Sequence, residues 1–105
     1  RHILIVENNG AIANMQDDAM VEVVCELGIN GPRPMRVGNI PQFNLGLLVN
    51  QVSCEKLIVD AYFENSYQKA LEAFTLNRLI NDAKKARKVL DALIEANKGM
   101  WPELR

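Results

Sequence analysis

A chain of 105 residues can bury the core of one domain, but it is too short to hold a nucleotide-binding domain together with a substrate domain. Its net charge of −1 gives no electrostatic reason to expect nucleic-acid binding, and no apolar run approaches the roughly 20 residues that span a bilayer. With 49% hydrophobic and 24% charged residues, the sequence predicts a single compact globular unit without a signal peptide, located in the cytoplasm.

Two apolar runs near the N-terminus predict neighbouring strands of one sheet. Residues 3–6 form a short β-branched run, which favours a strand buried on both faces and ended by Glu7. Residues 20–25 form the second run. After a hairpin-like connection at residues 28–31, residues 32–37 read as a returning strand, and its prolines place it at an edge of the sheet because they cannot donate to a ladder.

The hydrophobic period changes to that of helices near Pro41, which suits the first position of a helix over residues 41–65 because its missing amide hydrogen is not needed there. The apolar residues of this helix cover more than one stripe, so we expect it to form the core. They are Phe43, Leu47, Leu48, Val52, Leu57, Ile58, Ala61 and Tyr62. Ser66 is the candidate N-cap of a second helix that reaches Leu76, and a polar break at Asn81 and Asp82 caps the third.

Gly99 follows the third helix as its expected C′ residue, and the indole of Trp101 then covers the core or meets another chain. The fold class predicted is therefore α+β, with antiparallel strands in the first 40 residues followed by three helices.

The charged and sulfur-containing residues have mainly structural interpretations. Asp17 with Asp18, and the basic cluster around Lys84, are expected to be solvated. Arg33 and Arg36 could meet an anionic ligand, but an edge strand also uses such charges against aggregation. Cys25 and Cys54 are expected to be reduced core thiols, and the only histidine, His2, is expected to be structural or solvated.

The turn formed by Asn8, Asn9 and Gly10 is the candidate substrate-binding element. Asparagine and glycine tolerate positive φ and expose backbone amides, so the turn could cradle a ligand oxygen or could only reverse the chain. Both interpretations stay open at this point.

Three segments carry a family resemblance: NNGAIANMQDDAMVEV, NGPRPMRVGNIP, and the helix that leads into EANKGMWPEL. The chain resembles, nearly end to end, the C-terminal part of the family-4 glycoside hydrolases, and the ENNGAIAN and IPQF motifs are closest to the 6-phospho-α-glucosidases of that family. The resemblance implies a fold like the C-terminal domain of these enzymes and of lactate and malate dehydrogenases. Because the chain also starts at a strand without an initiator methionine, we interpret residues 1–105 as a C-terminal substrate and oligomerisation domain that lacks its N-terminal NAD-binding Rossmann domain.

For the full-length enzyme the resemblance implies NAD and a divalent metal, usually manganese, a phosphorylated disaccharide as substrate, and a homo-oligomer. NAD would take hydride from C3 of the sugar and a tyrosine would take the C2 proton; elimination, addition of water and return of the hydride would follow. The glycine-rich turn, the metal-binding cysteine and histidine motifs and the tyrosine of the family have no counterpart here, since Cys25 and Cys54 are each followed by glutamate. We therefore expect no catalytic, cofactor-binding or metal-binding residue in this stretch.

Other functions remain open. The preference could be for 6-phospho-β-glucosides, or the chain could be the substrate or assembly domain of a dehydrogenase of the lactate or malate type, which a metal-type cysteine motif upstream would exclude. A non-enzymatic α+β interaction domain is the third alternative, and it would require a start codon just before Arg1.

Overall fold

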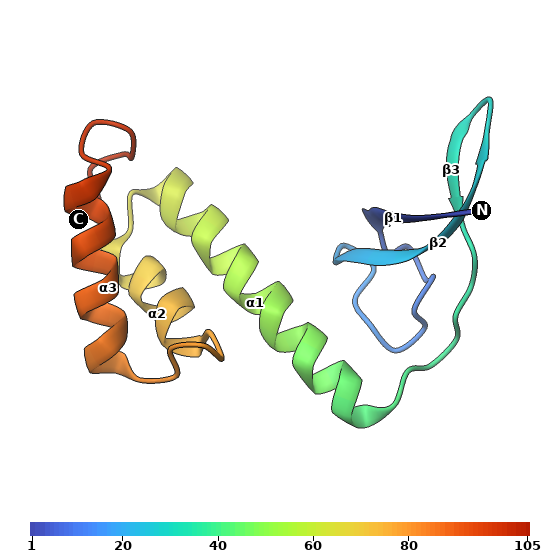
Figure 1. Cartoon of the computed structure of the whole chain (residues 1–105), viewed down its shortest axis with the longest axis horizontal. Coiled ribbons are helices and arrows are strands. Elements are labelled where there is room, and N and C mark those ends of the chain that lie inside the picture. Colours follow the sequence, from blue (N-terminus) through green and yellow to red (C-terminus); the bar gives the residue numbers. More distant parts are fainter. The chain divides into compact units, whose positions relative to one another are not determined.

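The computed structural model describes residues 1–105, and they form two compact units, Arg1–Val49 and Asn50–Arg105 (Figure 1). The single compact unit expected from chain length is therefore wrong. The α+β class is confirmed, because three antiparallel strands precede three helices. The strands are β1 (His2–Glu7), β2 (Met20–Gly28) and β3 (Gly31–Pro34), and the helices are α1 (Gln42–Glu64), α2 (Tyr67–Leu76) and α3 (Ala83–Ala96). None of these helices combines the length and the apolar character that crossing a membrane requires.

The sheet has the order β1-β2-β3, so β3 lies at an edge as its prolines predict. A tight turn between Gly28 and Gly31 joins β2 to β3. β3 ends at Pro34, three residues before the predicted end at Val37. The chain then leaves the sheet to pair with the segment after β1, since the Val37 amide donates to the Ala11 carbonyl over 2.8 Å and Gly38 forms a bridge with Ile12.

The core of the first unit lies on one face of the sheet. Leu4 and Val6 of β1 stand opposite Val23 and Val21 of β2, and this face is the buried one. The segment between β1 and β2 completes the core with Ala11, Ile12, Met15 and Ala19 (Figure 1). The opposite face is open, with Ile3 65% and Ile5 70% exposed, so the prediction that β1 is buried on both faces is wrong for this chain. Nothing in the first unit covers the second face.

The core of the second unit is centred on Ala61, Ala70 and Leu90, which come from three different helices. Half-buried Tyr67, Leu71, Phe74, Ile94 and Leu104 pack around them. The expectation that α1 forms the core is wrong, because its only buried residues are Val52, Cys54 and Ala61. Phe43 is 76% and Tyr62 57% exposed. An apolar helix surface shows which side chains favour burial, but it does not show that the same chain covers them.

The helix boundaries follow the expected capping. The hydroxyl of Ser66 accepts from the Lys69 amide over 3.2 Å, and a carboxylate oxygen of Asp82 accepts from the Lys85 amide over 2.9 Å, which confirms both N-caps. α1 begins at Gln42, so Pro41 precedes the helix and supplies its carbonyl to the Leu45 amide.

Past α3, the C-cap is Asn97, so the C′ residue is Lys98 and not Gly99 as predicted; Gly99, one position further on, has φ of 84°. Residues after Gly99 fold back toward the connection between α1 and α2. There the Arg105 amide donates to the Asn65 carbonyl over 2.8 Å, and the Tyr67 amide donates to the Arg105 carbonyl over 3.1 Å.

Candidate functional site

The candidate turn starts with a buried residue. Asn8 is only 1% exposed, and its Nδ2 donates to the carbonyls of Ile12, Met15 and Gln16 over 3.0, 3.2 and 3.0 Å. Its Oδ1 accepts from the Ile12 amide over 2.7 Å. Because these bonds occupy both polar atoms of the side chain, Asn8 organises the segment between β1 and β2 and cannot offer its amide to a ligand.

The other two residues of the turn, Asn9 and Gly10, are less buried than Asn8. Asn9 has φ of 41° and Gly10 has φ of 82°, so both adopt the left-handed conformation that these residue types tolerate. The Asn9 backbone amide donates to the Asp17 carbonyl over 2.9 Å, whereas its side chain is exposed and donates to Glu7 Oε2 over 3.2 Å. A ligand can therefore reach the Asn9 side chain by displacing a single exposed hydrogen bond.

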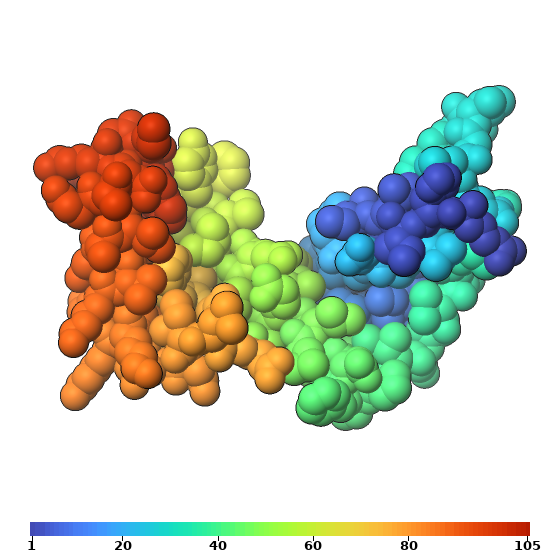
Figure 2. All heavy atoms as spheres, viewed as in Figure 1, coloured from blue at the N-terminus to red at the C-terminus, as the bar shows by residue number.

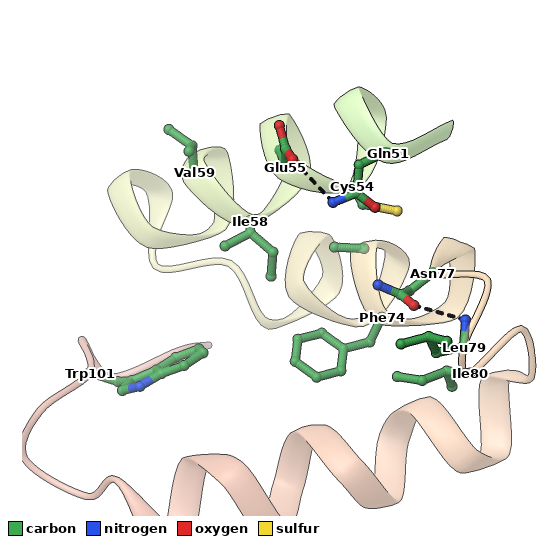
Figure 3. A pocket seen from close by; sticks show the side chains of 11 residues that line it. Gln51, Cys54, Glu55, Ile58, Val59, Phe74, Asn77, Leu79, Ile80 and Trp101 are labelled. Atoms are coloured by element: carbon green, nitrogen blue, oxygen red, sulfur yellow. Dashed lines mark hydrogen bonds between the residues drawn. The ribbon is translucent and has the colours of Figure 1, made fainter. Parts of the chain in front are cut away.

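The second unit contains an apolar groove of about 580 Å³ between α1, α2 and the C-terminal tail (Figure 3). Its apolar lining includes Cys54, Ile58, Phe74, Leu79, Ile80 and Trp101. Figure 3 shows the rings of Phe74 and Trp101 on the same side of this space, opposite Ile58 of α1.

Polar groups at the groove already have partners. Gln51 donates to Glu55 over 3.0 Å, and Asn77 Oδ1 accepts from the Leu79 amide over 2.9 Å. The groove therefore offers apolar contact rather than acid–base chemistry. Sequence reasoning missed it, although the apolar pair Leu79 and Ile80, placed between two helices, was an available signal.

Cys25 and Cys54 are free and buried, as predicted. Burial raises the pKa of the Cys54 thiol, and the neighbouring Glu55 carboxylate adds to this shift. A thiol whose pKa is raised is a poor nucleophile at neutral pH. The two cysteines thus behave as core residues.

The charged residues form local ion pairs. Arg33 of β3 pairs with Glu26 of β2, and this hydrogen bond and charge hold the pKa of the Glu26 carboxyl below its usual value. The guanidinium of Arg87 lies 5.8 Å from the centre of the Tyr67 ring, while the other members of the basic cluster, Lys84, Lys85 and Lys88, are exposed. Both features agree with the structural interpretation of these charges.

The residues present do not fit the cofactors that the family resemblance implies. No group of three or more His, Cys, Asp or Glu side chains converges to hold a metal ion. The turn after β1 leads into an irregular segment, not into a helix whose N-terminal amides could receive a pyrophosphate. No catalytic step can therefore be derived through NAD or a metal on these 105 residues.

Comparison with known proteins defines the family. Residues 1–80 match the model of the family 4 glycosyl hydrolase C-terminal domain, so the chain belongs to the family 4 glycosyl hydrolases. It is 56% identical to the maltose-6'-phosphate glucosidase of Bacillus subtilis over 99% of its length, and 54% identical to the 6-phospho-alpha-glucosidase of Leptotrichia buccalis over 100% of its length. These matches cover 23% and 24% of the two relatives, so the chain spans about a quarter of the length of the curated proteins it matches.

Solved structures agree with the fold. A 6-phospho-alpha-glucosidase from gut microorganisms, solved in complex with NAD and Mn²⁺, has a TM-score of 0.96 and 83% identity over 99% of this chain and 24% of its own. The 6-phospho-beta glucosidase of Thermotoga maritima has a TM-score of 0.88 and 29% identity, covering 99% of this chain and 26% of its own. The family resemblance read from the sequence motifs is confirmed.

Proposed function

We propose that the whole protein containing this chain is a glycosidase that hydrolyses 6-phospho-α-glucosides such as maltose 6'-phosphate. The observation that carries the proposal is the gradient of identity among the relatives. Identity is 56% with the maltose-6'-phosphate glucosidase of Bacillus subtilis, but only 40% with the probable 6-phospho-beta-glucosidase of the same organism. The gradient favours the α-glucoside over the β-glucoside. Membership of family 4 also argues against a dehydrogenase domain and a non-enzymatic interaction domain.

We also infer that the whole protein uses NAD and a divalent metal such as manganese. The supporting observations concern relatives: one solved 6-phospho-alpha-glucosidase contains NAD and Mn²⁺, and another contains NAD and glucose-6-phosphate. Since the present residues do not fit either group, both sites are assigned to the polypeptide outside residues 1–105, including its N-terminal domain.

The test uses the purified whole protein with NAD and Mn²⁺. Chromogenic 6-phospho-α-glucoside should be hydrolysed at least about tenfold faster than the matched 6-phospho-β-glucoside, because the two place the leaving group on opposite faces of the sugar. The unphosphorylated α-glucoside serves as the control for recognition of the phosphate. Faster hydrolysis of the β-anomer would contradict the assignment.

Within this domain, we propose that the turn of Asn9 and Gly10 borders the sugar-phosphate pocket. The buried side chain of Asn8 fixes the conformation of this turn through its hydrogen bonds to the following segment. The supporting features are the exposed side-chain carboxamide of Asn9, the left-handed backbone of Asn9 and Gly10, and the hydrogen bonds of the buried Asn8 side chain. In the whole protein, Asn9→Ala should lower kcat/KM by about tenfold, the effect of losing one hydrogen bond to substrate, and leave the melting temperature unchanged. Asn39→Ala, another exposed asparagine of the same unit, is the matched control. Unchanged kinetics for Asn9→Ala would reduce the turn to a scaffold.

We further propose that the enzyme acts in the cytoplasm as a homo-oligomer. Free thiols such as those of Cys25 and Cys54 persist in a reducing compartment. The exposed apolar residues of α1 and the groove beside Trp101 are the surfaces that a subunit contact would bury.

A further inference from the structure

The two outer strands of the sheet present different edges to their surroundings. β1 and β3 each pair with β2 on one side only, so each has a second side that no strand of this chain occupies. Which backbone groups point to that side follows from two hydrogen bonds. The Asn8 amide donates to the Ala19 carbonyl over 2.8 Å, and the Met35 amide donates to the Val24 carbonyl over 2.9 Å.

In an antiparallel ladder, hydrogen-bonded pairs alternate with pairs whose backbone groups point away from each other. Asn8 and Ala19 continue the register of β1 and β2 as a bonded pair, so Val6 and Leu4 also face β2, while Ile5 and Ile3 face outward. The Val24 carbonyl supports this assignment independently, because it points to β3 and not to its register partner Ile3.

The same alternation places the prolines of β3. Met35 and Val24 are a bonded pair, so the positions of β3 that face away from β2 are Pro34 and Pro32. Neither has an N–H, so the outer edge of β3 lacks the donors that another strand needs. The outer edge of β1 has no such protection: Ile3 and Ile5 keep their amides, and β1 contains neither proline nor lysine.

The outer face of the sheet is also incomplete. It is centred on four apolar side chains of β1 and β2, namely Ile3, Ile5, Met20 and Val24, which are 65%, 70%, 52% and 39% exposed. Glu22 lies within this face, opposite Ile5 and between Met20 and Val24 along β2, and the ion pair of Glu26 with Arg33 lies at its rim. An exposed face with this many apolar side chains favours contact with another segment, and an open apolar edge strand left in water is prone to aggregation.

We propose that a strand of the polypeptide preceding Arg1 in the whole protein pairs with the outer edge of β1, and that the same polypeptide covers the outer face. The matching family model describes a C-terminal domain, and the relatives are about four times as long as this chain, so polypeptide precedes this stretch in those proteins. β1 starts at His2, so any such polypeptide enters beside the open edge. Consecutive strands are neighbours in roughly two-thirds of cases, which favours this occupant over a second copy.

Residue-resolved hydrogen exchange on the whole protein tests the edge. The outward amides of Ile3 and Ile5 should exchange on the order of 100-fold more slowly than unprotected amides, as buried ladder bonds do. Ile29, at the hairpin turn, is fully exposed and gives the reference for free exchange; Figure 2 shows this hairpin as a narrow projection from the first unit. Free exchange at Ile3 and Ile5 would overturn the proposal. Protection that disappears on dilution to monomer would assign the edge to a second copy and would overturn it equally.

A matched pair of substitutions tests the face. A lysine in place of Ile5 would stand opposite Glu22, so Ile5→Lys is neutral or favourable if the face is open to water. If the face is covered, the same change buries a charge and lowers the melting temperature of the whole protein. Ile29→Lys makes the identical replacement at the hairpin turn and should leave the melting temperature unchanged. Equal melting temperatures for both variants and the parent would overturn the covered face.

Discussion

The side chain of Asn14 forms two hydrogen bonds with the backbone of Ile40, 26 residues further along the chain. Its Nδ2 donates to the Ile40 carbonyl and its Oδ1 accepts from the Ile40 amide, each over 3.0 Å. The carboxamide thus acts as a strand partner for a single residue. It fixes the approach to α1 against the segment that also carries the candidate turn.

Replacing Asn14 by alanine should therefore loosen the approach to α1. Loss of the two hydrogen bonds at an exposed site should lower the free energy of unfolding by about 1 kcal/mol and speed exchange of the Ile40 amide. Thermal unfolding and hydrogen exchange of the whole protein measure these effects. Asn39→Ala removes a neighbouring exposed asparagine and should change neither. Slow exchange at Ile40 in the Asn14 variant would contradict the assigned role.

Asn8 should be the most sensitive position of the first unit. Asn8→Ala leaves the buried carbonyl of Met15 and the amide of Ile12 without a partner, so we expect the free energy of unfolding to fall by about 3 kcal/mol or more. The Ile12 carbonyl keeps its hydrogen bond from the Met15 amide. Asn8→Asp keeps the shape but faces the same carbonyls with a carboxylate and should also destabilise. Urea unfolding of the whole protein measures both. A stability close to that of Asn9→Ala would show that water can replace the network.

The hydrogen bond between Tyr67 and Asp91 gives a prediction for alkaline pH. The Tyr67 hydroxyl donates to Asp91 Oδ1 over 2.7 Å; this bond raises the pKa of the phenol above its usual 10.0, and burial and the charge of Asp91 act in the same direction. A raised pKa means that the folded state holds the proton more tightly. The resulting stability is complete below pH 10.0 and is lost as the pH rises through the pKa of the folded protein.

Tyr67→Phe should therefore lower stability at neutral pH and make the alkaline decline shallower than in the parent. Thermal unfolding between about pH 8 and pH 11 covers the range in which tyrosine titrates. Tyr62→Phe, at an exposed position on α1, provides the comparison and should leave the profile of the parent unchanged. Parallel alkaline declines for the parent and the Tyr67 variant would rule out the linkage.

The groove beside Trp101 should contribute to subunit association in the whole enzyme. Trp101→Ala removes a large apolar side chain from the groove and should shift the oligomer toward smaller species. Light scattering across a dilution series gives the state, and Leu79→Ala, at the same groove and 95% exposed, is a second probe. A stable monomer for the parent protein at micromolar concentration would count against the contact.

The isolated chain should be inactive. We expect neither NAD nor Mn²⁺ to bind to residues 1–105 alone, because no converging ligand group or phosphate-binding turn is present. Its exposed apolar surfaces should also make it poorly stable or self-associating. Calorimetric titration and an assay on a chromogenic 6-phosphoglucoside, with the whole protein as the positive control, measure this. Micromolar cofactor binding or turnover by the isolated chain would relocate the active site.

The local features of the fold were predictable because they depend on neighbouring residues. Ser66 and Asp82 cap helices through amides only three residues away, and the prolines of β3 cannot donate wherever the strand lies. Whether a given apolar side chain is buried by the rest of this chain was not predictable. Ile3 and Phe43 have apolar side chains that favour burial, yet both are exposed, since the sequence does not reveal whether the covering atoms belong to the same stretch of chain.

The candidate site shows the same division. Composition indicated a turn at Asn9 and Gly10, and the positive φ values of both residues confirm the conformation. The different role of Asn8 was not visible, because its partners are backbone carbonyls up to eight residues away and carry no side-chain signature. The groove was missed for a related reason. Its lining residues come from two helices, the loop after α2 and the tail, and the sequence of any one of these segments does not indicate that they pack together.

The hydrogen bonds of Asn8 also restrict how this domain can change in length during evolution. Its side chain reaches carbonyls four, seven and eight residues ahead, so inserting or deleting one residue between Asn8 and Gln16 would displace at least one of them. Most irregular segments accept such changes, whereas the hydrogen bonds of Asn8 fix the number of residues in this one. Length differences among homologous sequences should therefore concentrate at the hairpin turn between Gly28 and Gly31 or after Asn97, and spare the stretch between β1 and β2.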